Sequence, residues 1–449
     1  LSPDFITFLC ILKACGSTGA LEKGMQIHQE IVRTNLVEKD NAICNALVDM
    51  YAKCGMLEKA QEVFEDSPIR DVVSWNTLIA AYLEHGFHEE VLDVFNKMQA
   101  VSILPDATTF VCILKSCSIL RAIEKGQELH RQIMVADLER VLFVGNSLVM
   151  FYVKSGCHEE AKDVFEELPI RDVVSWTSLI LGYAEHGLAQ EGLALFEQMK
   201  TQCVHPDSVI LASCLKCCGN IGALEQGREV HLAITKYGFD CLCNHSFNDC
   251  FLSNMTCQNV GNAIIDMYAK CGNMVDAQKA FSMSSVGDRV AWNTLIAGYA
   301  RQEDSELVFH LVQNMMEAMI LPDELTFLSI LSVCSHGGLL NEGRNCFEVI
   351  SNSYGITITI GHCNCLLDLF GRSGQVDEAT EIVKSLPLQP NLVTWSTLLD
   401  AYRKARNVEL SMKAFKSALR SSQENISSFI LMSNIYAACG IRDGIEMIG

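Results

Sequence analysis

The chain has 449 residues, with 34 Lys and Arg against 54 Asp and Glu and hence a net charge of −20. Its apolar fraction of 49% supplies a large core, which excludes an intrinsically disordered chain, and its acidity argues against binding nucleic acid by bulk positive charge. No apolar run approaches the roughly 18 residues that cross a bilayer, so we expect a soluble protein.

Three short strings each occur three times along the chain. They begin at Thr7, Thr109 and Thr326 (TFLCILKAC and variants), at Asn45, Asn146 and Asn262 (NALVDMYAKCG), and at Asp71, Asp172 and Asp288 (DVVSWNTLIAAY). Self-similarity at a fixed period indicates a repeat architecture. The chain therefore consists of super-repeats of about 101 residues, each made of three repeats of 35, 35 and 31 residues.

Each repeat reads as two short helices. Between residues 72 and 106, two apolar faces with helical spacing are separated by Gly86, and Pro105 ends the repeat because proline cannot continue a helix. The two faces comprise Trp75, Leu78, Ile79 and Tyr82, then Val91, Val94, Phe95 and Met98. Since so small a helix pair cannot bury its own apolar face, neighbouring repeats must stack into an all-α solenoid.

The repeats follow one another almost without linkers. The sequence places their starts near Phe5, Asn41, Val72, Ala107, Leu142, Val173, Ser208, Gln258, Arg289, Glu324, Ile360, Leu392 and Ile426. Because the chain starts at the end of one repeat and stops inside another, we expect a fragment of a longer protein. One irregular insert, Cys243–Cys257, has no helical period and is predicted to be a loop.

The 21 cysteines do not form the even, closely spaced pattern of a secreted disulfide framework. Cys15, Cys117, Cys218 and Cys334 recur at one repeat position, and we interpret them as reduced core residues. Other cysteines offer metal-type ligands at irregular spacings, so we predict no zinc site; these candidates are Cys214 and Cys217, then Cys241, Cys243, His245, Cys250 and Cys257.

Two polar positions in each repeat are candidates for reading a nucleic-acid base. Asn76 follows Trp75 on the first helix, and Asp106 ends the same repeat just before the next first helix. Stacking would place such pairs along one concave edge, where each could hydrogen-bond one base. The pairs are Asn45 with Asp71, Asn76 with Asp106, Asn146 with Asp172, Thr177 with Asp207, Asn262 with Asp288, Asn293 with Asp323, and Asn364 with Asn391. The intervening repeats carry Leu9, Val111, Ala212 and Leu328, which we interpret as spacers.

The chain resembles pentatricopeptide repeat proteins through its 35-residue repeats ending in Pro-Asp, its VVSWNTLIAAY helices and its NALVDMYAKCG segments. The 35/35/31 alternation resembles the plant PLS subclass, with the tandem array over residues 5–391 and E-type motifs over 392–449. This resemblance implies a right-handed α-solenoid in a mitochondrion or chloroplast, the mitochondrion slightly preferred. It also implies a partner, single-stranded organellar RNA, and a role as site-recognition factor for cytidine-to-uridine editing.

The family's code implies base preferences: Asn with Asp favours uridine, Thr with Asp favours guanine, and Asn with Asn favours cytidine. Val73, Val174 and Val290 fit the apolar residue that sandwiches each base in this family. The editing chemistry would come from a deaminase or editing-complex protein in trans, or from a zinc deaminase domain of the DYW type following this chain.

Other interpretations stay open. The Asp residues are also good N-caps, and both roles can coexist. Tetratricopeptide repeats, which usually bind proteins, are the structural competitor, and the acidic surface would suit a protein-binding scaffold. His88-Glu89-Glu90 and His158-Glu159-Glu160 match half of a zinc deaminase motif, but no P-C-x-x-C follows, so we place them at second-helix starts. We expect neither a catalytic centre nor a cofactor in this chain.

Overall fold

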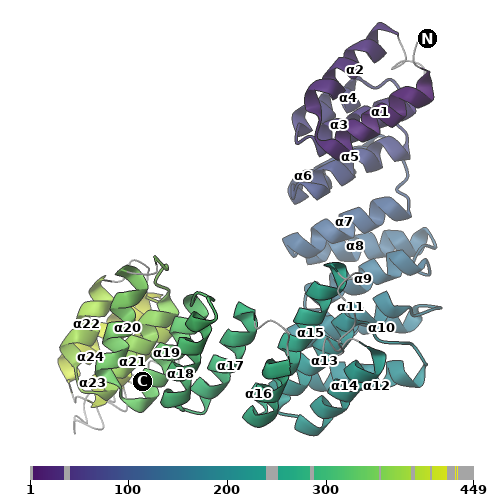
Figure 1. Cartoon of the computed structure of the whole chain (residues 1–449). Helices are drawn as coiled ribbons and strands as arrows, with labels where there is room; N and C mark the ends of the chain where they lie inside the picture. The colour runs from purple at the N-terminus through teal and green to yellow at the C-terminus, as the bar shows by residue number, and fades with distance from the viewer. Residues whose placement is uncertain are drawn as a thin grey trace. The chain divides into compact units, whose positions relative to one another are not determined.

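A computed structural model describes residues 4–34, 41–238, 251–283, 288–352, 355–385, 390–404, 407–421, 430 and 432. The residues so described form 24 helices and no strand, which confirms the predicted all-α class. The chain divides into two compact parts, Leu1–Cys217 and Cys218–Gly449, and within each part consecutive helical hairpins lie side by side (Figure 1). Within its described part, no helix is long and apolar enough to cross a membrane.

The N-terminal part stacks six complete hairpins. Its helices are α1 (Phe5–Thr18), α2 (Leu21–Arg33), α3 (Asn41–Lys53), α4 (Leu57–Asp66), α5 (Val72–Glu84), α6 (His88–Ala100), α7 (Ala107–Leu120), α8 (Ile123–Val135), α9 (Leu142–Lys154), α10 (His158–Glu167), α11 (Val173–Glu185) and α12 (Ala189–Thr201). The first helices of successive repeats contact one another from α1 to α11. The next first helix, α13 (Ser208–Ile221), contains the boundary between the parts.

The C-terminal part continues the same alternation. Its helices are α14 (Leu224–Tyr237), α15 (Phe251–Lys270), α16 (Met274–Met283), α17 (Arg289–Arg301), α18 (Ser305–Glu317), α19 (Glu324–Gly337), α20 (Leu340–Asn352), α21 (Ile360–Arg372), α22 (Val376–Ser385), α23 (Leu392–Lys404) and α24 (Val408–Ser421). Here too, successive first helices pack together, from α15 to α23.

With one exception, the first helices begin at the residues where the repeated strings place the repeat starts. The exception is α15, which begins at Phe251 instead of Gln258, so the prediction of a loop is wrong for residues 251–257. These seven residues contain neither glycine nor proline, and a helix can extend along such a sequence without an amphipathic period. Residues 243–250 and the last repeat start, Ile426, lie outside the described residues.

The predicted apolar faces form the core. The four residues predicted on α5 and the four on α6 are all buried. An edge-to-face contact between Trp176 and Phe165, with ring centroids 4.8 Å apart, joins α11 to α10 of the preceding repeat. The same Phe–Trp contact recurs one super-repeat earlier, between Phe64 and Trp75 at 4.8 Å. In both places a Phe–Trp contact of the same kind joins a 31-residue repeat to the following 35-residue repeat.

The recurring cysteines are core residues, as predicted. Cys15, Cys117, Cys218 and Cys334 are all buried. Burial raises the pKa of Cys117 and of Cys334 to about 11, so both thiols stay protonated at neutral pH. A buried protonated thiol behaves as a small apolar side chain rather than as a nucleophile or metal ligand.

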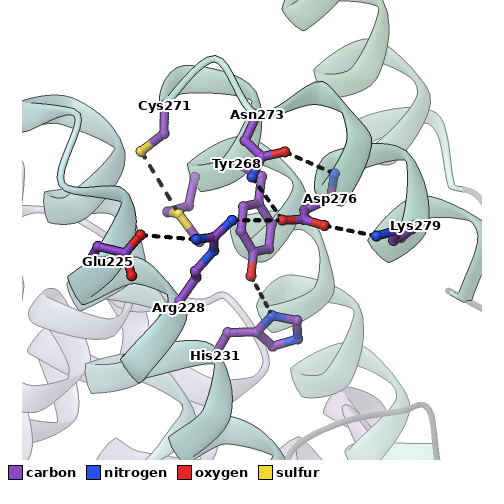
Figure 2. A network of polar contacts seen from close by, with 9 residues as sticks. Glu225, Arg228, His231, Tyr268, Cys271, Asn273, Asp276 and Lys279 are labelled. Atoms are coloured by element: carbon purple, nitrogen blue, oxygen red, sulfur yellow. Dashed lines mark hydrogen bonds and ion pairs between the residues drawn. The ribbon is translucent and has the colours of Figure 1, made fainter.

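Polar contacts also join neighbouring repeats, as Figure 2 shows for α14, α15 and α16. The Arg228 guanidinium bridges Glu225 at 2.9 Å and Asp276 at 3.3 Å, so it links α14 to α16. His231 Nδ1 and the Tyr268 hydroxyl form a hydrogen bond of 3.0 Å between α14 and α15. The same His–Tyr bond occurs in the two earlier super-repeats, as His28 with Tyr51 and His130 with Tyr152.

Four residues just after second helices of 35-residue repeats adopt a left-handed backbone conformation, namely Ser102, Asp137, Cys203 and Met319. Met319 has φ 62° and an 88% exposed side chain, so its Cβ is strained while its side chain packs against little. We expect Met319→Gly to raise the free energy of unfolding by about 0.5–1 kcal/mol, because the relief of strain exceeds the entropy that glycine adds to the unfolded chain.

Urea unfolding followed by circular dichroism measures this effect. Met319→Ala is the matched control, since it removes the same exposed side chain but keeps the strained Cβ, and should show no gain. A glycine variant that unfolds at lower urea than the alanine variant would contradict the strain argument.

Candidate nucleic-acid interface

The candidate aspartates cap the first helices. Asp106 Oδ1 accepts a hydrogen bond of 2.9 Å from the Thr109 backbone N–H at the start of α7, and Asp172 does the same for Ser175 at the start of α11. The others that cap in this way are Asp71, Asp207, Asp288 and Asp323. The capping interpretation is therefore confirmed. In all six, capping uses Oδ1, so it does not by itself exclude a second role for the carboxylate.

Five of the seven predicted pairs are joined by a direct hydrogen bond. Asn76 Nδ2 donates to Asp106 Oδ1 at 3.0 Å, although the two residues are 30 positions apart. The other four joined pairs are Asn146 with Asp172 at 3.3 Å, Thr177 with Asp207 at 3.2 Å, Asn262 with Asp288 at 3.2 Å, and Asn293 with Asp323 at 2.9 Å. Stacking thus brings the end of one repeat beside the first helix of the same repeat, and places a similar polar pair at each of these repeats.

The remaining two pairs are not hydrogen-bonded to each other among the described residues. Near Asp71, the amide of Asn41 takes the place expected for Asn45: its Nδ2 donates to Ser74 Oγ at 2.9 Å. Asn45 is four residues further along α3, one turn away on the same helix. Of these two amides one turn apart, the one that reaches the cap is that of Asn41.

Asn364 and Asn391 are the other separate pair. Asn391 Oδ1 caps the Thr394 N–H at 2.9 Å, while Asn364 Oδ1 is buried and has no hydrogen-bond partner within the described ranges. A buried amide oxygen without a donor is costly.

A third polar residue, which the sequence analysis missed, completes three of these sites. The Thr109 hydroxyl donates to Asn76 Oδ1 at 2.6 Å and lies 2.9 Å from Asp106 Oδ1. Ser175 contacts Asn146, and Thr326 contacts Asn293, also at 2.6 Å. The signal was present in the sequence, because a Ser or Thr three residues after the capping Asp is typical of a helix start.

The carboxylates of Asp71 and Asp106 are charged at neutral pH. Burial raises the pKa of Asp106, but hydrogen bonds from the Thr109 N–H, the Asn76 amide and the Thr109 hydroxyl outweigh burial, so the pKa lies below its usual value. The same balance, with burial opposed by hydrogen bonds from Ser74 and Asn41, lowers the pKa of Asp71. These two sites therefore each carry a negative charge at a helix N-terminus, where the helix dipole stabilises it.

An exposed apolar residue accompanies four of the polar pairs, those of Asn76, Asn146, Thr177 and Asn293. Val73, Val174 and Val290, the predicted sandwiching residues, are 57–58% exposed. Val73 precedes Asn76 by three residues, so the two side chains are neighbours on one face of α5. The structure adds five exposed apolar residues at the same helix position, which the sequence analysis did not name: Ile6, Phe143, Val209, Leu325 and Val393.

Of the candidate metal ligands, only Cys214 and Cys217 have side chains within the described residues, and these two form no metal site there. Cys214 and Cys217 are buried within α13, and burial raises the pKa of Cys217 to about 11, which disfavours a metal-binding thiolate. The insert candidates Cys241, Cys243, His245 and Cys250 lie outside the described residues, as does the Cys257 side chain. Over the ranges that the structure describes, no group of three or more His, Cys, Asp or Glu residues could hold a metal ion. His88 and His158 begin α6 and α10, as predicted.

Comparison with known proteins identifies the repeats. A family model described as a PPR repeat matches residues 42–68, 146–173, 174–204, 262–283, 362–387 and 393–422, and a model of the PPR repeat family matches 70–118 and 287–336. A mitochondrial pentatricopeptide repeat-containing protein from Arabidopsis thaliana, named as putative, is 32% identical over 449 residues, covering 100% of this chain and 70% of that protein. A chloroplastic one from the same plant is 31% identical over 440 residues, covering 98% of this chain and 49% of that protein.

The chain thus spans about half to seven tenths of the length of these curated relatives. Among solved structures, the pentatricopeptide repeat protein PPR10 from maize is 16% identical, with a TM-score of 0.49 and coverage of 98% of this chain and 82% of that one. A second structure of PPR10, in complex with an 18-nt psaJ RNA element, is 17% identical, with a TM-score of 0.42 and coverage of 98% and 80%.

Proposed function

The chain belongs to the pentatricopeptide repeat family, and from this premise we propose that it binds single-stranded RNA, one repeat to a base, and selects a site for cytidine-to-uridine editing. The observation that carries the proposal is the recurrence of one arrangement: a hydrogen-bonded Asn–Asp or Thr–Asp pair beside an exposed apolar residue. Such a site offers hydrogen bonds to a base edge and an apolar surface for the base face.

Single-stranded RNA is the partner that suits these sites. In duplex RNA the base edges are paired, whereas unstacked bases of a single strand expose both their edges and their faces. Reading by neutral amides and hydroxyls is compatible with a net charge of −20, because it does not depend on bulk attraction to phosphates. We therefore expect a shallower loss of affinity with salt than for a basic RNA-binding surface.

The editing role and the organelle rest on resemblance to the plant PLS subclass. The alternation of 35, 35 and 31 residues supports that subclass, and we propose E-type motifs over residues 392–449. The deaminase would act in trans, as a partner or editing-complex protein, or as a DYW-type domain outside this chain. Since relatives are named mitochondrial or chloroplastic, we propose one of these organelles, with the mitochondrion preferred.

The family's code then gives a target. With the N-terminal repeat toward the 5′ end, the repeats from Asn41 onward favour U-U-n-U-G-n-U-U-n-Y, where n is unread and Y is a pyrimidine. The unread bases face the repeats of Val111, Ala212 and Leu328, whose half-buried apolar side chains offer no hydrogen bond. If each repeat binds one base, the protein should therefore tolerate any base at these three places in the RNA.

We expect the chain to bind this RNA at least tenfold more tightly than an RNA of the same composition in shuffled order, since several base contacts of about 1–3 kcal/mol each are lost on shuffling. Gel-shift titration of the full chain at two salt concentrations measures this ratio. Equal affinity for the two RNAs would instead favour non-specific binding, or the alternative of a protein-binding scaffold.

A further inference from the structure

The third residue of each repeat varies with the code residue of the repeat before it, which is the residue at the place that Asn76 takes in its own repeat. Repeats whose code residue is Asn45, Asn76, Asn146, Asn293 or Asn364 are followed by a hydroxyl at that place: Ser74, Thr109, Ser175, Thr326 and Thr394. Repeats with an apolar or Thr code residue are followed instead by Ile43, Val144, Ile210, Val260 and His362. The single exception among the Asn repeats is Asn262, which is followed by Ala291.

The structure gives this correlation a physical cause in three repeats. Thr109, Ser175 and Thr326 are essentially fully buried, and each hydroxyl donates to the amide oxygen of the Asn before it at 2.6 Å. The amide nitrogen of the same Asn donates to the capping Asp. Both ends of the amide are therefore held, and the amide cannot turn over without losing two hydrogen bonds.

The Thr177 repeat shows why a hydroxyl is not needed everywhere. The Thr177 side chain has no amide to orient, and its hydroxyl already bonds the Val173 carbonyl at 2.7 Å and Asp207 at 3.2 Å. The residue that follows at the third helix position is Ile210, which is fully buried. An apolar residue at this place is thus compatible with the packing of the repeats. Among the repeats named above, a hydroxyl at this place is found only after those whose code residue is Asn.

We propose that this buried hydroxyl is a positioning residue for base selection. It holds the oxygen of the Asn amide away from the base, so that one amide N–H remains to bond the base. This inference rests on the proposed function. An amide fixed in this orientation presents an N–H to a carbonyl, such as O4 of uracil, rather than its oxygen to an amino group, such as N4 of cytosine. The hydroxyl would therefore set the preference for uracil over cytosine without touching the RNA.

Thr109→Val tests the proposal by removing one hydroxyl. Valine is isosteric with threonine, and Val144 fills the same place in the next repeat with 0% exposure, so the stack tolerates it. The probe is U-U-n-U-G-n-U-U-n-Y RNA with U or C at its second base, which faces Asn76. We expect the preference for U over C at that base to fall about five- to tenfold, while the preference at the eighth base, facing Asn293, stays unchanged.

Ala291→Ser is the reciprocal test, because it supplies the hydroxyl that the Asn262 repeat lacks. Ala291 is 2% exposed, and its backbone N–H already bonds Asp288, so a serine hydroxyl would reach the Asn262 amide oxygen as Ser175 reaches Asn146. We expect wild-type protein to discriminate U from C weakly at the seventh base, and Ala291→Ser to raise that discrimination about fivefold.

Thr109→Ser is the matched control, since it keeps the hydroxyl and should retain the wild-type preference. If Thr109→Val lowers affinity for the U and C probes by the same factor, or leaves the preference intact, the hydroxyl is only structural and the inference is overturned. A wild-type chain with no base preference at any position would overturn the proposed function, and the inference with it; the wild-type titration alone tells these outcomes apart.

Discussion

Replacing Trp176 by alanine should lower the free energy of unfolding by about 3–5 kcal/mol, the usual cost of truncating a fully buried tryptophan. Its side chain is 0% exposed on α11, and its ring packs edge-on against Phe165 of the preceding repeat. The truncation therefore opens a cavity at an interface between repeats. In a solenoid, stability is roughly a sum of repeat and interface terms, so losing one interface uncouples the stack on its two sides.

Trp176→Phe provides the matched control. The Trp176 indole N–H is buried and has no hydrogen-bond partner in the described part of the chain, so phenylalanine sacrifices volume but no hydrogen bond. We expect it to cost well under half as much as alanine, as measured by urea unfolding followed by circular dichroism. If both variants cost the same, or if Trp176→Ala costs less than about 1 kcal/mol, the Phe–Trp contact does not hold the repeats together.

Much of the fold could be predicted from the sequence because each repeat carries its own strong signals. The apolar spacing from Trp75 to Tyr82 defines one buried face, and Asp71 marks the helix start by capping it. These signals are local and occur several times, so agreement between copies fixed the helix starts. The same repetition placed Asn76 and Asp106 together, since a separation of one repeat becomes a short distance in a stack.

Contacts that depend on how a side chain is oriented toward the neighbouring repeat could not be predicted from the sequence. Asn41 and Asn45 lie one turn apart on α3, and the choice of Asn41 as the partner of Ser74 follows from packing, not from spacing. The hydroxyls of Thr109 and Thr326 appeared to be ordinary helix-start residues until their contacts with the preceding Asn were visible. Residues 251–257 lack an amphipathic period, yet they continue α15, because a helix can be extended by backbone hydrogen bonds alone.

The second large effect is expected from Thr177→Asn, which changes the code residue of the fifth repeat in the proposed register. Thr177 with Asp207 should prefer guanine, and asparagine would reproduce the pair formed by Asn262 and Asp288, which should favour uracil. The Asn262 repeat is the right comparison, because neither it nor the Thr177 repeat is followed by a hydroxyl. We expect about a tenfold loss of affinity for the G probe and a comparable gain for the U probe.

The substitution should leave folding nearly unchanged. Thr177 is half-buried on the flank of α11, and asparagine and threonine have similar helix propensities. Thr177→Ser serves as the control, since it keeps a hydroxyl within reach of Asp207 and should keep the preference for guanine. Circular dichroism and thermal unfolding of the three proteins would separate a change of specificity from a loss of structure.

The most direct test of base reading, repeat by repeat, is a set of four dissociation constants: wild type and Thr177→Asn, each with U-U-n-U-G-n-U-U-n-Y RNA and with its fifth base changed to U. We expect the order of affinities to reverse, with wild type preferring the G probe and the variant preferring the U probe. If the folded variant instead loses affinity for both probes by the same factor, Thr177 does not read a base, and the assignment of the other Asn–Asp pairs to individual bases is wrong.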